Sequence, residues 1–125
     1  MSMNFFVVPT TLKEVNPEDY YTYVHIGQRF YLGWTFRSYE YGNRAGQPVF
    51  MKIKNSWQWE SFLRKLPTDF KIVDEADRIY TSYEMLHIID GCPKVDPEPL
   101  KEDKFSRHFY YYDLNGYLFC TENFS

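Results

Sequence analysis

Alternation of hydrophobic and polar residues predicts strands in the first half of the chain. The run Phe5–Val8 is apolar throughout, as in a buried strand. Three further segments, residues 20–26, 31–41 and 48–54, alternate with a period of two and are separated by glycine-containing turns. Because the connections are short, we predict that these three segments form an antiparallel meander, with Gly27 ending its first strand.

The alternation divides the meander into two faces, because successive strand side chains point to opposite sides. One face is apolar and is predicted to meet the helices: Val24, Ile26, Leu32, Trp34, Phe36, Val49, Met51 and Ile53. The other combines aromatic rings with basic groups: Tyr21, Tyr23, His25, Arg37, Tyr39, Tyr41, Phe50, Lys52 and Lys54.

Apolar residues in the second half follow helical spacing in two places. Asn55 or Ser56 can cap a helix that Pro67 prevents from continuing. Its apolar positions are Trp59, Phe62, Leu63 and Leu66. Thr81 and Glu84 form a capping-box pattern that opens a second helix, through about Asp90.

Turn signals complete the predicted fold. Two short strands flank the turn 75–77, residues 92–104 read as an exposed loop with three prolines, and Asn115-Gly116 predicts a closing hairpin. We therefore predict one domain over residues 1–125. Its class is α+β, with an antiparallel sheet of about five or six strands and two helices packed on one face.

Composition and charge add a hint about partners. Aromatic residues make up 21% of the chain, including 12 tyrosines, which suit half-buried sheet faces and contact surfaces equally well. The net charge is −3, yet residues 21–66 carry seven basic groups against two acidic ones, and residues 67–125 carry six against twelve. The basic region coincides with the predicted meander.

Missing signatures narrow the function classes. The N-terminus lacks the pattern of a signal peptide and no apolar run is long enough to span a membrane, so we expect a soluble cytoplasmic protein. Cys92 and Cys120 have no metal-ligand spacing, and we expect reduced thiols, no metal site and no cofactor. No phosphate-binding loop or nucleophile motif occurs, so a small hydrolase is the least favoured class.

The aromatic and basic face is the candidate binding site. Rings that stack on bases, interleaved with cations that meet phosphates, are typical of nucleic-acid or nucleotide binding. The candidate residues are His25, Arg29, Arg37, Tyr39, Tyr41, Phe50, Lys52 and Lys54. The alternative, which we favour, is that the C-terminal hairpin covers part of this face and creates a second core. His25 and Gly27 would then be parts of a strand and turn and not a ligand site.

The pattern His25-Ile26-Gly27 followed by Gly33-Trp34 resembles a group of small, functionally uncharacterised proteins of tailed bacteriophages. The likeness continues through residues 57–59, 72–75, 115–117 and 124–125. It implies a phage accessory protein in the cytoplasm of an infected bacterium and supplies no catalytic residues. Such proteins often bind host machinery or defence proteins, so the favoured function is non-catalytic binding of a host protein. The oligomeric state stays open.

Overall fold

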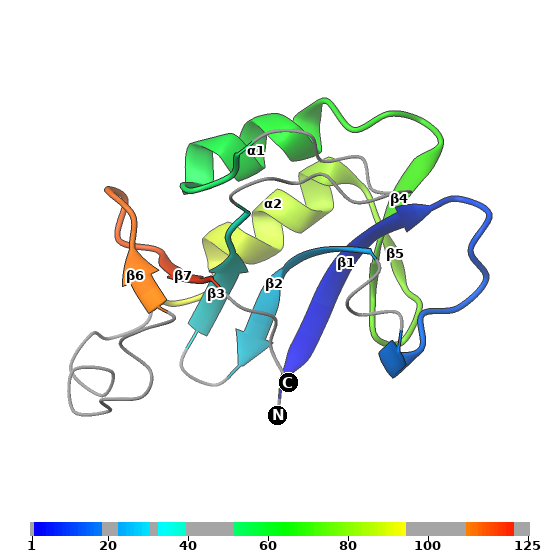
Figure 1. The fold of residues 1–125 in the computed structure, drawn as a ribbon, viewed down its shortest axis with the longest axis horizontal. Helices are drawn as coiled ribbons and strands as arrows, with labels where there is room; N and C mark the ends of the chain where they lie inside the picture. Colours follow the sequence, from blue (N-terminus) through cyan, green and yellow to red (C-terminus); the bar gives the residue numbers. More distant parts are fainter. Residues whose placement is uncertain (1, 19–22, 31–32, 40–51, 95–109, 122–125) are drawn as a thin grey trace.

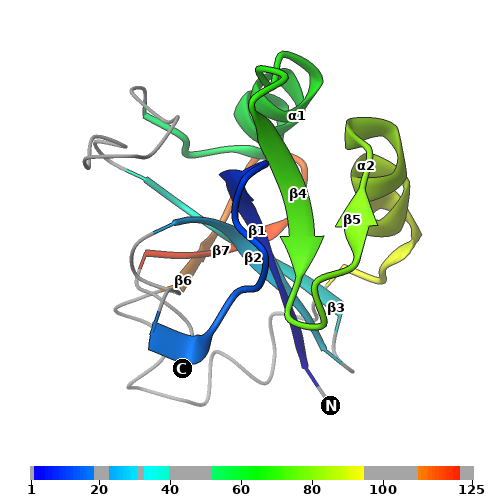
Figure 2. The same cartoon turned by 90° about the vertical axis from the view of Figure 1, so that its right-hand side faces the viewer.

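The computed structural model of the protein describes residues 2–18, 23–30, 33–39, 52–94 and 110–121. Within these ranges, seven strands form one sheet and two helices lie side by side on one of its faces (Figures 1 and 2). The strands are β1 (Met3–Pro9), β2 (Val24–Phe30), β3 (Gly33–Arg37), β4 (Phe70–Asp74), β5 (Ile79–Tyr80), β6 (Tyr110–Tyr112) and β7 (Leu118–Cys120), and the helices are α1 (Ser56–Arg64) and α2 (Ser82–Gly91). The α+β class is confirmed, with slightly more strands than predicted.

The sheet runs in the order β5-β4-β1-β2-β3-β7-β6, and every neighbouring pair is antiparallel except β3 and β7. The first two strands of the predicted meander pair antiparallel, as β2 and β3, and its predicted third strand, residues 48–54, lies mostly outside the described residues. Residues 40–51 lie outside the described part, and Ile53 forms an isolated antiparallel bridge with Tyr39. The position beside β3 is taken by β7, in parallel.

A bulge shapes β2. Phe5 of β1 lies opposite Gly27 and Phe6 lies opposite His25, so Ile26 is an extra residue without a partner in β1. The strand also continues through Gly27 to Phe30, past the predicted end. The helix-side core contains Val24 and Ile26, as the alternation predicted.

Both helices begin where their capping residues predicted. The Asn55 side chain accepts a hydrogen bond from the Gln58 N–H (2.9 Å), and Thr81 does the same for Glu84 (3.0 Å). In each case the third helical residue returns a bond to the cap backbone, which completes a capping box. These reciprocal bonds fix where each helix starts.

The main core lies between the sheet and the helices, where Trp59 and Leu63 of α1 and Met85 and Ile89 of α2 pack against the apolar sheet face. A smaller core on the opposite face contains Phe6, Val8, Val15 and Val73. Leu12 and Val15, from the segment after β1, pack into it. A second core thus exists, but the β6–β7 hairpin does not cover it, because that hairpin extends the sheet beside β3.

Candidate functional site

His25, the central residue of the predicted binding face, is completely buried. Its imidazole stacks on Phe6 (ring centroids 4.6 Å apart, planes at 29°), and its Nε2 lies 2.9 Å from Oδ1 of Asn4. Burial, together with the nearby charge of Arg37, lowers the pKa of His25 to about 3. His25 is therefore a neutral interior group, and the prediction that it lies on an open binding face is wrong.

Arg37 and Tyr39 are held by contacts within the protein. The Tyr39 ring packs edge-on against Trp59 of α1 (centroids 6.2 Å apart, planes at 69°), and its hydroxyl accepts a hydrogen bond from the His25 N–H (2.8 Å). The guanidinium of Arg37 lies over the same ring, 4.8 Å from its centroid. Tyr39 thus packs with the helix-side core and not on the opposite face.

The remaining predicted residues do not gather at one place in the described part of the chain. Lys54 lies just before α1, with its Nζ 5.8 Å from the centroid of the Tyr111 ring, while Lys52 is exposed. Arg29 is exposed on β2 and lines a hollow near the end of α2. Tyr41 and Phe50 lie outside the described residues.

Three exposed apolar side chains gather instead beside the start of α1. Trp57 is 59% exposed, Leu114 93% and Tyr112 36%, and all three line one hollow of about 240 Å³. The other large exposed hydrophobics of the described residues, Ile79 and Tyr83, lie outside this hollow. We name Trp57, Tyr112 and Leu114 the apolar ridge.

Hydrogen bonds fix the hairpin turn against the start of α1. Asp113 Oδ2 accepts from the Ser56 N–H (2.8 Å), and its Oδ1 accepts from the N–H groups of Asn115 (3.0 Å) and Tyr117 (2.9 Å). Asn115 Nδ2 donates to the Ser56 hydroxyl (2.8 Å). A carboxylate at a helix N-terminus is electrostatically favourable, so these contacts pre-organise the ridge.

A groove of about 400 Å³ runs from the ridge between the two helices. Trp57 and Asn115 line both the groove and the ridge hollow, so the two are neighbours on the surface. We name it the α1–α2 groove; its lining residues are Phe36, Ser56, Trp57, Glu60, Arg64, Leu86, Ile89, Asp90, Lys94, Asn115 and Tyr117.

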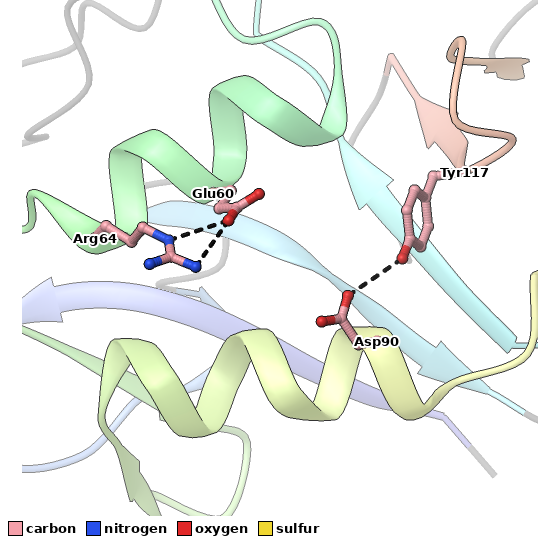
Figure 3. A network of polar contacts seen from close by, with 4 residues as sticks. All are labelled: Glu60, Arg64, Asp90 and Tyr117. Atoms are coloured by element: carbon pink, nitrogen blue, oxygen red, sulfur yellow. Dashed lines mark hydrogen bonds and ion pairs between the residues drawn. The ribbon is translucent and has the colours of Figure 1, made fainter.

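Two polar contacts mark the groove walls (Figure 3). On α1, Glu60 Oε1 forms an ion pair with Arg64 (2.8 Å to Nη2). On α2, Asp90 Oδ1 accepts a long hydrogen bond from the Tyr117 hydroxyl (3.4 Å). Burial raises the pKa of Tyr117, and the Asp90 charge raises it further. The phenol therefore stays protonated and donates to the carboxylate.

The hollow at the end of α2 contains Cys92 and Arg29. Burial raises the pKa of Cys92, although Arg29 acts in the opposite direction. A raised pKa keeps the thiol protonated near neutral pH, which is the opposite of what a nucleophilic cysteine needs. This hollow therefore offers little support for covalent catalysis.

The described residues contain neither a cluster of metal-ligating side chains nor a helix that could span a membrane. No group of three or more histidine, cysteine, aspartate or glutamate side chains there is placed to hold a metal ion. No described helix is long and apolar enough to cross a membrane.

The sequence prediction missed the ridge because its residues come from two distant segments. Trp57 lies outside the apolar stripe that contains Trp59, Phe62 and Leu63. This position could have indicated that its side chain is exposed. Leu114 precedes the Asn115-Gly116 turn, where polar residues are usual. Comparison of the chain with protein-family models, curated proteins and solved structures found no match, so the geometry of this surface carries the argument for a function.

Proposed function

We propose that this protein acts without catalysis, by binding another protein through the apolar ridge. The supporting observation is that Trp57, Tyr112 and Leu114 converge, exposed, beside an open groove. Tryptophan and tyrosine are the residues that most often dominate binding energy at protein interfaces. The hydrogen bonds of Asp113 hold the ridge in place before binding, which lowers the entropy lost on association.

The proposed partner is a host bacterial protein, in keeping with the phage resemblance of the sequence. A nucleic-acid partner has less support, because the rings and cations it requires are engaged elsewhere. Tyr39 packs on Trp59, and Lys54 lies over Tyr111. An acidic chain of net charge −3 also attracts a polyanion poorly.

The test compares two double variants with the wild-type protein as tagged baits in bacterial cytoplasm. Trp57→Ala/Leu114→Ala removes the ridge, whereas Ile79→Ala/Tyr83→Ala removes equally exposed apolar groups elsewhere. We expect a host protein that the wild type and the control capture and the ridge variant loses. With that partner purified, the ridge variant should bind about thirtyfold more weakly or worse, as for loss of a hot-spot residue.

Two results would contradict the proposal. One is that both double variants lose the same partner, which would indicate general damage to the protein. The other is that no captured protein depends on Trp57 and Leu114.

A further inference from the structure

We infer that the α1–α2 groove accepts an arginine side chain from the protein segment that binds the apolar ridge. This inference rests on the proposed function, since it specifies the chemistry that the partner presents next to the ridge.

The charges on α1 compensate each other. Glu60 and Arg64 are one helical turn apart and form an ion pair (2.8 Å), so together they leave little net charge in the groove. On the other wall, Asp90 is exposed and forms no ion pair with any residue of the described ranges. Within those ranges, the one hydrogen bond of its carboxylate is the 3.4 Å contact with the Tyr117 hydroxyl.

The position of Asp90 makes this wall more negative. Asp90 lies in the last turn of α2, where the helix dipole places partial negative charge and where a cation would be favourable. Lys94 is nearby, but its Nζ donates to the Asn115 carbonyl and lies 5.0 Å from the centroid of the Tyr117 ring. Lys94 Nζ is thus held on the hairpin and forms no ion pair with Asp90, so the carboxylate can still accept the paired N–H groups of an incoming guanidinium.

An arginine fits this arrangement better than a lysine does. A planar guanidinium can stack on an indole and at the same time donate two hydrogen bonds to a carboxylate, which an ammonium group cannot do. Trp57 and Asp90 both line the groove and supply these two surfaces. An apolar residue beside the arginine would then reach the ridge.

The test selects ligands for the wild-type protein from a displayed random peptide library and keeps those that the Trp57→Ala variant fails to bind. We expect these peptides to carry an arginine next to an apolar residue. Resynthesis with citrulline, a neutral isostere of arginine, should weaken binding about tenfold. In Asp90→Asn, the arginine and citrulline peptides should bind almost equally, whereas Asp69→Asn, an exposed aspartate outside the groove, should keep the difference.

Other results separate the two proposals. Peptides that need Trp57 but lack arginine, or whose arginine preference survives in Asp90→Asn, would overturn the inference and leave protein binding by the ridge in place. A selection that gives no peptide dependent on Trp57 would count against both.

Discussion

The indole of Trp34 occupies the space that a side chain on Gly27 would need. A Cβ added to Gly27 would lie 2.7 Å from an atom of the Trp34 ring and 2.3 Å from the carbonyl oxygen of Thr35. Gly27 therefore allows the largest side chain of β3 to lie across β2. This contact explains the glycine of the His25-Ile26-Gly27 pattern by packing.

Gly33, the second glycine of the pattern, is required for a different structural reason. Its φ is +127°, and an added Cβ would lie 2.0 Å from the carbonyl oxygen of Pro93. The chain leaving α2 thus passes directly over the start of β3. Both glycines of the pattern serve close backbone and ring contacts.

The first prediction concerns Gly27. Gly27→Ala should lower the free energy of unfolding by about 1 to 3 kcal/mol, the usual cost of overpacking, because neither Trp34 nor the Thr35 carbonyl can move freely. Gly91→Ala is the control, since a Cβ there meets no atom within 4 Å and alanine favours a helix. Urea unfolding of both variants measures the difference, and equal stabilities would contradict the packing role of Gly27.

The second prediction contrasts two tryptophans. Trp34 is 1% exposed, so Trp34→Ala should cost about 3 to 5 kcal/mol. Trp57 is 59% exposed, so Trp57→Ala should change stability by less than about 0.5 kcal/mol while removing ridge-dependent binding. Chemical denaturation checks both values. A large loss of stability in Trp57→Ala would mean that Trp57 supports the fold.

The third prediction follows from the low pKa of His25. Its folded value of about 3 lies below the ordinary 6.5, so the unfolded chain binds more protons between these values. Stability should therefore be fully present above pH 6.5 and fall as the pH drops toward 3, with His25 contributing up to about 1.4 kcal/mol per pH unit.

Nuclear magnetic resonance of the histidine side chains provides the direct measurement for His25. Its imidazole signals should keep the neutral form as the pH is lowered through 6.5. A midpoint near 6.5 for His25 would show that the ring reaches water and would remove its contribution to acid sensitivity.

The fourth prediction is that the Asp90 carboxylate lowers the stability of the folded protein. Asp90→Asn removes a negative charge from the C-terminal turn of α2 and can still accept from Tyr117, so unfolding should require about 0.3 to 1 kcal/mol more. Glu60→Gln should instead lose about 0.3 to 0.5 kcal/mol, because it breaks the exposed ion pair with Arg64. Thermal unfolding of the two variants should shift in opposite directions; a destabilised Asp90→Asn would contradict the electrostatic account.

The parts of the fold that the sequence predicted well depend on local interactions. Thr81 and Glu84 bond to each other's backbone within one helical turn, and Asn115-Gly116 forms its turn within one hairpin. Trp34 and Phe36 were assigned to the core from their alternation alone, which is confirmed. Each of these signals lies within a few residues.

The parts that the sequence did not predict depend on distant segments. No local pattern predicts that β7 pairs with β3. None predicts that Ile26 forms a bulge where β2 pairs with β1. The apolar ridge was not predicted for the same reason: Trp57 and Leu114 meet only when the hairpin packs against α1. The charged and aromatic residues around His25 predicted an exposed binding face. In the fold, however, the imidazole is buried against Phe6 and Asn4, which come from the neighbouring strand β1.

The parallel pairing of β3 with β7 sets an order of events during synthesis on the ribosome. Ser38, just after β3, bonds to the Cys120 carbonyl 82 positions later, so β3 leaves the ribosome long before its outer neighbour exists. Such remote pairing slows folding, because the loop must close before the contacts can form. The strand that completes the sheet belongs to the hairpin that carries Tyr112 and Leu114. In a nascent chain, the hairpin part of the apolar ridge thus takes its place in the same step that completes the sheet.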